Sequence, residues 1–173
     1  MSISLCLLVL VPIMSERIAT DATSPAHLLV VGSVAFDNVI TPYGEKEHIL
    51  GGAASYCSFA SSYFAETRMV GVVGNDFGEE FMDRLRSRGI DLEGLQRDES
   101  GPTFFWKGKY HENFNRRDTL DLQLNVFEKF RPDLPESYRA SPFVLLGNIH
   151  PALQAHVLDQ LSGESFVLAD TID

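Results

Sequence analysis

The feature that most constrains the fold is a glycine pair, Gly51 and Gly52, which opens a stretch of helical character that runs to residue 65. A glycine pair lets the backbone turn sharply and lets a ligand approach closely, because no Cβ stands in the way. Alanines and serines keep much of this stretch slim, so we expect the helix to pack closely against a sheet. Its unpaired N–H groups would then point at a pocket beside the glycines. The alternative is an ordinary tight turn into a buried helix.

Apolar runs of strand length flank this helix, at residues 27–34 and 67–74. Continuous apolar runs are typical of strands that are buried on both faces of a parallel sheet. Two later runs, at residues 143–147 and 165–171, enclose a predicted helix over residues 152–161. The sequence therefore predicts an α/β fold with a mostly parallel central sheet.

A carboxylate and an amide follow two of these predicted strands. Asp37 comes shortly after the first run, and Asn148 follows the run at residues 143–147. Open α/β sheets bind ligands outside the carboxyl ends of their strands, so we expect both side chains to face one crevice. An ionised carboxylate only accepts hydrogen bonds, which suits vicinal hydroxyls. The alternative for Asp37 is a turn residue that caps local N–H groups. Farther along, Asp76 is expected to cap a helix that ends at Gly89.

The segment at residues 92–127 has strand character and carries three consecutive aromatic residues, Phe104, Phe105 and Trp106. Neighbouring side chains on a strand point to opposite faces, so these three cannot all face one core. We expect at least one of them to contact a ligand or a second chain, the alternative being burial on both sides within one domain. Leucines that alternate with polar residues between 120 and 126 predict a half-buried strand.

Composition narrows the class of partner. The formal net charge is −10 and the sequence pI is about 4.9, which disfavours binding to nucleic acid or to an anionic membrane. The two cysteines, Cys6 and Cys57, lie far apart, and no histidine shows zinc-ligand spacing with them, so we predict neither a disulfide framework nor a metal site. A reduced, cytoplasmic setting fits this usage.

Residues 1–25 form a separate leader and arm. The apolar stretch up to Met14 has the length of a signal-peptide core but lacks a preceding Lys or Arg and a convincing cleavage site. We interpret it as an over-extended start, with translation beginning at Met14 and a disordered arm up to Pro25. The alternative is a secreted domain.

Four short motifs occur in an order that resembles the N-terminal half of a ribokinase-like (PfkB family) sugar kinase. They are residues 31–37, 51–54, 70–78 and 88–91. The resemblance implies a three-layer α/β/α fold with a mostly parallel sheet and a small β-sheet lid over the substrate. On this basis we assign residues 26–173 to the N-terminal part of a kinase domain, with lid strands at about 92–127.

The resemblance also implies roles for single residues. Asp37 would bind sugar hydroxyls, Gly51 and Gly52 would shape the sugar pocket, Asn148 would contact substrate, and the lid would contribute Phe104 and Trp106. The sequence departs from the family pattern at Tyr56 and at Ala35, since the family often has asparagine at both positions. Tyr56 therefore stands in the predicted substrate site, and the resemblance leaves the choice between a sugar and a nucleoside open.

The resemblance implies an ATP-dependent kinase that uses Mg²⁺. The family's catalytic aspartate lies in a Gly-Ala-Gly-Asp segment, which we expect beyond residue 173, and the sequence contains no Gly-x-x-x-x-Gly-Lys-Ser/Thr phosphate loop. We therefore expect a truncated domain that holds the acceptor-binding half, is inactive alone, and has no catalytic residue of its own. A homodimer through the lid strands is a further expectation. The alternative function is a non-catalytic sugar-binding or dimerisation module.

Overall fold

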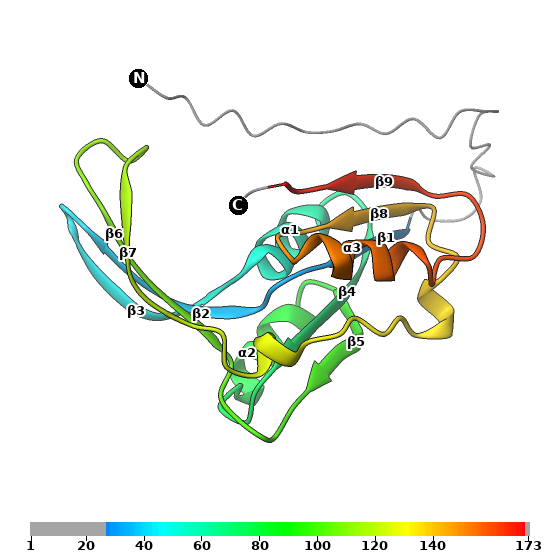
Figure 1. Cartoon of the computed structure of the whole chain (residues 1–173), viewed down its shortest axis with the longest axis horizontal. Helices are drawn as coiled ribbons and strands as arrows, with labels where there is room; N and C mark the ends of the chain where they lie inside the picture. The colour runs from blue at the N-terminus through cyan, green and yellow to red at the C-terminus, as the bar shows by residue number, and fades with distance from the viewer. Residues whose placement is uncertain (1–26, 172–173) are drawn as a thin grey trace.

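Two sheets that stand at an angle to each other make up the protein (Figure 1). The computed structural model describes residues 27–171, so the predictions on the leader, on Met14 and on Cys6 lie outside the described residues. The main sheet has five strands, all parallel, in the order β5-β4-β1-β8-β9. Its strands are β1 (His27–Val31), β4 (Glu66–Val73), β5 (Asp91–Arg97), β8 (Phe143–Leu146) and β9 (Phe166–Ala169). The predicted mostly parallel sheet is confirmed.

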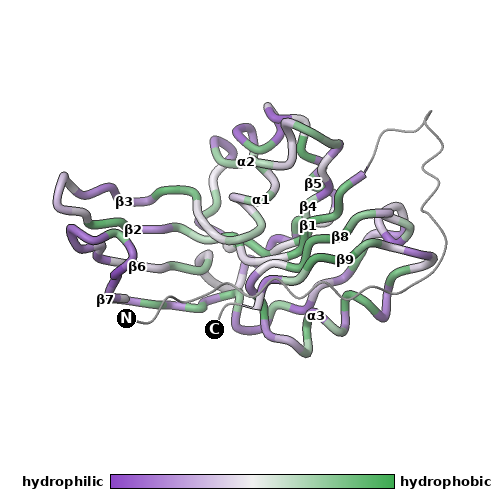
Figure 2. The backbone as a smooth tube through the Cα atoms, turned by 90° about the horizontal axis from the view of Figure 1, so that it is seen from above, coloured by the Kyte–Doolittle hydropathy of each residue, from purple (hydrophilic) through white to green (hydrophobic). Residues whose placement is uncertain are grey.

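Helices and turns cover both faces of the main sheet, which gives three layers. Helices α1 (Ala53–Ser61) and α2 (Glu79–Arg86) share a buried cluster with Val30 of β1. Leu29 and Val31 point the other way, into a cluster with α3 (Pro151–Leu158) and with the short helices η1 (Asn125–Lys129) and η2 (Glu136–Tyr138). Strands β1, β8 and β9 are accordingly hydrophobic over much of their length (Figure 2). Burial of both faces accounts for the continuous apolar sequence of the central strand β1, whereas Phe166 in the edge strand β9 is 38% exposed.

Helix α1 packs closely against the sheet, as its small side chains predict. The buried positions are Ala54, Ser55 and Ser58, and Tyr56 points outward with 56% of its surface exposed. Small side chains let the helix axis come close to the sheet, and the larger ones are left at the surface.

The second sheet has four strands in the order β3-β2-β6-β7. Strands β2 and β6 pair in parallel, whereas the two outer pairs are antiparallel. Its outer ends are hydrophilic, in contrast to the main sheet (Figure 2). The strands are β2 (Ala35–Thr41), β3 (Gly44–Gly51), β6 (Phe104–Tyr110) and β7 (Arg117–Gln123).

The range that we assigned to lid strands, 92–127, is divided between the two sheets. Strand β5 pairs with β4 in the main sheet, because Leu92 and Leu95 join the buried cluster under α2. The second sheet instead recruits β2 and β3, which precede the range. The predicted half-buried strand was wrong, since all of β7 is exposed, with Leu120 at 51% and Leu122 at 52%.

The predicted cap of α2 was also wrong. Gly78 is the N-cap residue, and Asp76 instead accepts hydrogen bonds of 2.7 Å from both the backbone N–H and the hydroxyl of Thr103. The carboxylate thus ties the loop after β4 to the start of β6. The helix also ends earlier than predicted, at Arg86 with Ser87 as its C-cap, and Gly89, with a φ of +71°, lies in the turn that follows.

Candidate functional site

The candidate site lies in the corner where β1 passes into β2 and α1 begins. Gly52 has a φ of +90°, and a Cβ there would overlap the carbonyl of Ser33. A Cβ on Gly32 would lie 3.1 Å from the backbone nitrogen of Ala54. The sharp turn and the close approach of two backbone segments therefore both require glycine.

Ser33 accepts hydrogen bonds from the first two backbone amides of α1. Ala53 N–H donates to the Ser33 hydroxyl at 3.0 Å, and Ala54 N–H donates to the Ser33 carbonyl at 2.9 Å. The expectation of unpaired donors aimed at a ligand was wrong for these two groups. These two hydrogen bonds hold the start of α1 against the end of β1. The two amides are therefore used within the fold and do not bind an anion.

Asp37 lies within β2, a strand of the second sheet, and not in a turn after the central strand. Its register partners are Ile49 in β3 and Trp106 in β6. Gly51 lies directly against it, because a Cβ on Gly51 would overlap the Asp37 carboxylate. The glycine thus leaves the space that the carboxylate fills.

Burial dominates the electrostatics of this carboxylate. Desolvation raises the pKa of Asp37 from 3.8 to about 6, and a hydrogen bond from Tyr56 partly opposes the shift. Burial also raises the pKa of Tyr56, with the charge of Asp37 and the nearby Tyr110 as further causes. At neutral pH the corner therefore holds an ionised carboxylate that accepts a hydrogen bond from a neutral phenol.

Trp106 presents its ring on the same side of the second sheet as Asp37, because partners in register point to the same face. Its indole lies over Gly108, where a Cβ would overlap it, and its Nε1 donates to the hydroxyl of Thr119 at 3.2 Å. The ring of Tyr110 meets it edge to face, with centroids 6.4 Å apart.

The other two predicted residues lie at the margins of this corner. Phe104 stacks on Phe127 at 5.3 Å, which attaches the base of β6 to η1. Asn148 is exposed and follows β8, the neighbour of β1. Among residues 27–171 no hydrogen bond joins Asn148 to Asp37 or Tyr56. The structure thus brings together Asp37, Gly51, Tyr56 and Trp106.

Tyr110 and Ser33 were not among the residues predicted for this site. Tyr110 lies four residues after Trp106 on one strand, and even spacing places both side chains on one face. The even spacing of these two residues was visible in the sequence. Ser33 had no such signal, since its role depends on how close α1 comes to β1.

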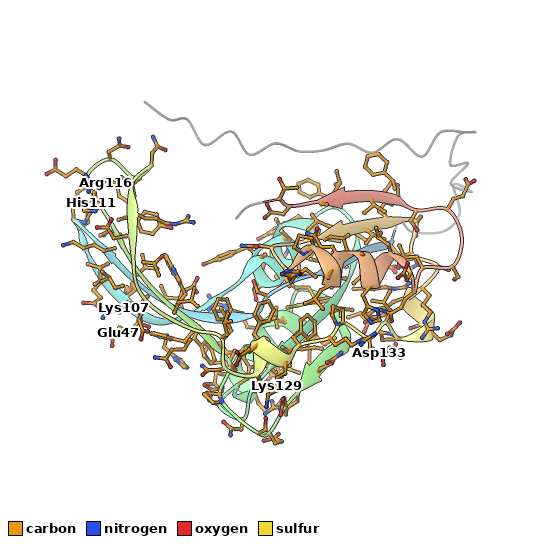
Figure 3. All side chains as sticks on the ribbon, in the orientation of Figure 1. Glu47, Lys107, His111, Arg116, Lys129 and Asp133 are labelled. Atoms are coloured by element: carbon orange, nitrogen blue, oxygen red, sulfur yellow. The ribbon has the colours of Figure 1, made fainter. Side chains whose placement is uncertain are left out.

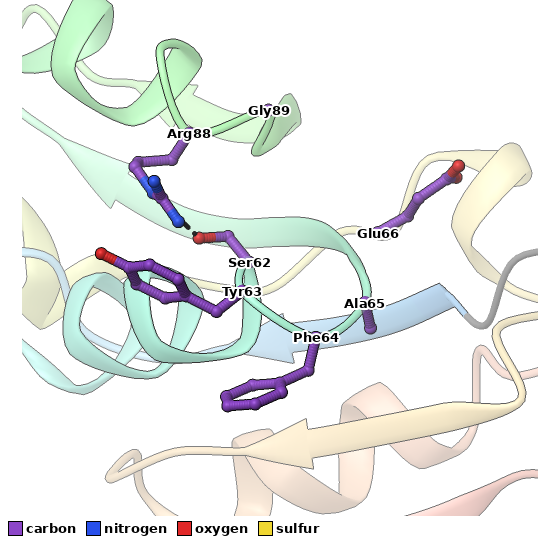
Figure 4. A pocket seen from close by; sticks show the side chains of 7 residues that line it. All are labelled: Ser62, Tyr63, Phe64, Ala65, Glu66, Arg88 and Gly89. Carbon is purple, nitrogen blue, oxygen red and sulfur yellow. Dashed lines mark hydrogen bonds between the residues drawn. The ribbon is translucent and has the colours of Figure 1, made fainter.

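A separate hollow of about 470 Å³ lies near the start of β4 (Figure 4). Arg88 closes one side, with its guanidinium 3.8 Å from the ring centroid of Tyr63 and its Nε donating to Ser62 at 3.4 Å. This end of the sheet holds the amino ends of the strands, so it is opposite the edge where parallel sheets place ligands.

Two further findings concern metals and membranes. Within residues 27–171, His, Cys, Asp and Glu side chains nowhere gather in threes around a point that could hold a metal ion. Over the same residues, every helix is too short or too polar to cross a bilayer.

Comparison with known proteins shows what the chain is similar to. Residues 25–105 match the pfkB family carbohydrate kinase domain. The cytidine kinase of Thermococcus kodakarensis is 29% identical over 141 residues, which are 79% of this chain and 49% of that protein. The chain therefore spans about half the length of this relative.

Solved structures show the same fold. The ribokinase of Cryptococcus neoformans in complex with ADP superposes with a TM-score of 0.66 at 18% identity, over 83% of this chain and 47% of that one. The nucleoside kinase of Burkholderia thailandensis in complex with inosine gives 0.59 at 17% identity, over 69% and 44%. The predicted ribokinase-like α/β fold is confirmed, and residues 25–105 of the chain are similar to the pfkB family carbohydrate kinase domain.

Proposed function

We propose that this chain forms the acceptor-binding half of a phosphotransferase that moves a phosphoryl group from ATP to a hydroxyl of a sugar or nucleoside. The observation that carries the proposal is the half-buried Asp37 carboxylate in the corner between the two sheets. Gly51 gives it space, and β2 holds it in a fixed register. The similarity of residues 25–105 to a carbohydrate kinase domain supports the reaction type.

The role of Asp37 is to orient the acceptor. Above its pKa of about 6 the carboxylate is ionised and accepts hydrogen bonds from two neighbouring hydroxyls. A hydrogen bond to a charged group contributes about 1.5–3 kcal/mol. In the free protein the Tyr56 hydroxyl donates a hydrogen bond to Asp37. When substrate binds, a substrate hydroxyl would either replace this donor or form a hydrogen bond with the Tyr56 hydroxyl.

ATP supplies the phosphoryl group, and Mg²⁺ would neutralise charge on it. In the described residues, Ser33 accepts hydrogen bonds from the first two amides of α1, and no three His, Cys, Asp or Glu side chains gather as metal ligands. We therefore assign no step of the transfer itself to residues 27–171. The chain's own residues bind the acceptor, orient its hydroxyl and limit its access to water. We propose that the chain alone binds acceptor without phosphorylating it.

A binding experiment with a matched control tests this function. Isothermal calorimetry would measure the affinity of the chain for ribose, hexoses and nucleosides, with Asp37→Asn and Glu47→Gln as variants. Glu47 is an exposed carboxylate on β3, and Figure 3 shows it with Lys107 on the outer side of the second sheet. We expect Asp37→Asn to weaken binding about tenfold or more and Glu47→Gln to leave it unchanged. Equal binding by all three proteins would refute the proposal.

Turnover provides the second test. ADP release would be measured over the same panel for this chain and for a version extended through any coding sequence that continues its reading frame. We expect turnover only in the extended protein. Turnover in neither protein, with acceptor binding retained, would favour the alternative of a non-catalytic binding module.

We also propose that β7 mediates a homodimer. It is an edge strand, and both Leu120 and Leu122 are about half exposed on it. Exposed apolar edge strands favour pairing with another chain. We expect sedimentation to give a dimer that Leu120→Lys converts to a monomer, and a monomeric wild-type chain would refute this. A cytoplasmic setting completes the proposal, in line with the free, half-buried Cys57.

A further inference from the structure

Three aromatic side chains lie beside the Asp37 carboxylate or in contact with its neighbours, and we call Tyr56, Trp106 and Tyr110 the aromatic wall. Tyr56 reaches the carboxylate from α1 through its hydroxyl, and Tyr110 is near enough to Tyr56 to influence its pKa. Trp106 is the register partner of Asp37 on the neighbouring strand. Adjacent strands lie about 4.8 Å apart, so the backbone that carries the indole lies about one strand spacing from the backbone that carries the carboxylate.

The second sheet holds two of these rings in place. Gly108 lets the indole of Trp106 lie flat along the strand, and the bond from its Nε1 to Thr119 fixes its rotation. Tyr110 contacts Trp106 on one side and Phe114 on the other, with the second pair of centroids 6.2 Å apart. A wall that is fixed before a ligand arrives loses little conformational entropy on binding.

Arg117 lies 5.9 Å from the centroid of the Trp106 ring, so a cation is present at the outer edge. The corner thus offers a carboxylate for hydroxyls and, beside it, the indole of Trp106 with the Tyr110 ring edge to face against it. A free pentose or hexose presents only its C–H groups to such a ring, whereas a planar base stacks on it with a full π-face. A ribose with an attached planar base uses both parts.

We propose, building on the function proposed above, that the aromatic wall binds the base of a nucleoside whose ribose hydroxyls are held by Asp37. Tyr56 is then a specificity-determining residue, since it connects the carboxylate to the wall. Stacking of a base on an aromatic side chain contributes enough affinity for a factor of about ten or more. The expected substrate class is therefore nucleosides rather than free sugars.

Trp106 provides the readout, because it is the only tryptophan in the sequence. Its fluorescence would be followed while the chain is titrated with cytidine, inosine and ribose, and calorimetry would supply the affinities. We expect both nucleosides to perturb the Trp106 emission and to bind at least about tenfold more tightly than ribose. Equal affinities for nucleosides and ribose would overturn the inference while leaving the proposed function intact, whereas no binding of any of the three would overturn both.

Variants at Tyr110 test whether the ring of this residue causes the nucleoside preference. Tyr110→Leu removes a ring of the wall and is expected to lower nucleoside affinity to that of ribose, whereas Tyr110→Phe keeps the ring and should keep the preference. Tyr63→Leu is the control, because Tyr63 is 70% exposed and lies in the separate hollow at the amino ends of the strands. Circular dichroism confirms that each variant is folded. A nucleoside preference that survives Tyr110→Leu in the folded chain would contradict the assignment.

Discussion

Replacing Asp37 by asparagine is expected to stabilise the protein at neutral pH although it removes the central group of the candidate site. The folded-state pKa of Asp37 is about 6, above its ordinary value of 3.8. The fold therefore prefers the protonated carboxyl, whose stabilising contribution is complete below about pH 4 and is lost as the pH rises to 6. Asparagine is neutral throughout and avoids this loss.

The magnitude follows from the shift. A change from 3.8 to about 6 corresponds to about 3 kcal/mol for a fully desolvated group. Asp37 is only partly buried, and solvent screens part of the effect, so we expect about 1–2 kcal/mol. For a chain of this size, that raises the midpoint of thermal unfolding by roughly 3–6 °C.

Urea unfolding at pH 4 and at pH 7.5 measures the effect. The free energy of unfolding of Asp37→Asn relative to the wild type should increase by about 1–2 kcal/mol between the two pH values. Glu47→Gln is the control and should show no such change, because Glu47 is exposed. A difference between wild type and Asp37→Asn that is the same at both pH values would refute the desolvation of Asp37.

Three further predictions concern neighbouring residues. Gly51→Ala places a methyl group on the Asp37 carboxylate and should destabilise the chain by about 1–3 kcal/mol in urea unfolding, whereas at Gly101 a Cβ meets its nearest atom at 3.6 Å and should change the midpoint little. Tyr56→Phe removes the hydrogen bond that lowers the pKa of Asp37, so the carboxyl should titrate above pH 6 by NMR; a midpoint at or below 6 would show that the phenol does not donate to it. Thr103→Val removes a buried hydroxyl that accepts from one backbone amide and donates to a carboxylate, which should cost about 2–3 kcal/mol of unfolding free energy; a loss below 0.5 kcal/mol would contradict its structural role.

Much of the main sheet could be predicted from the sequence, because its strands are buried on both faces and carry uninterrupted apolar runs. The run beginning at Leu28 and the run around Val70 need no knowledge of their partners to be read as strands. The slim helix after Gly52 was predictable for the same reason, since only small side chains allow its close packing.

The second sheet could not be predicted in the same way, because its strands come from distant parts of the chain. In the sequence, β2 looks like a continuation of the first strand. Only its parallel pairing with β6 in the structure shows that Asp37 belongs to another sheet. The alternating leucines of β7 indicated a covered face, but a sequence pattern does not tell whether a second layer exists. The environment of Asp37 depends on both of these long-range arrangements.

The pH dependence of nucleoside affinity tests the central claim most directly, because it ties binding to the Asp37 carboxylate. Calorimetry between pH 5 and 8 should show affinity that is constant above about pH 7 and falls below the pKa of about 6. Tyr56 stays protonated over this range, since its pKa is raised above 10, and does not contribute. Asp37→Asn should bind weakly at every pH. A wild-type affinity that does not change between pH 5 and 8 would contradict the claim that the ionised Asp37 holds the acceptor.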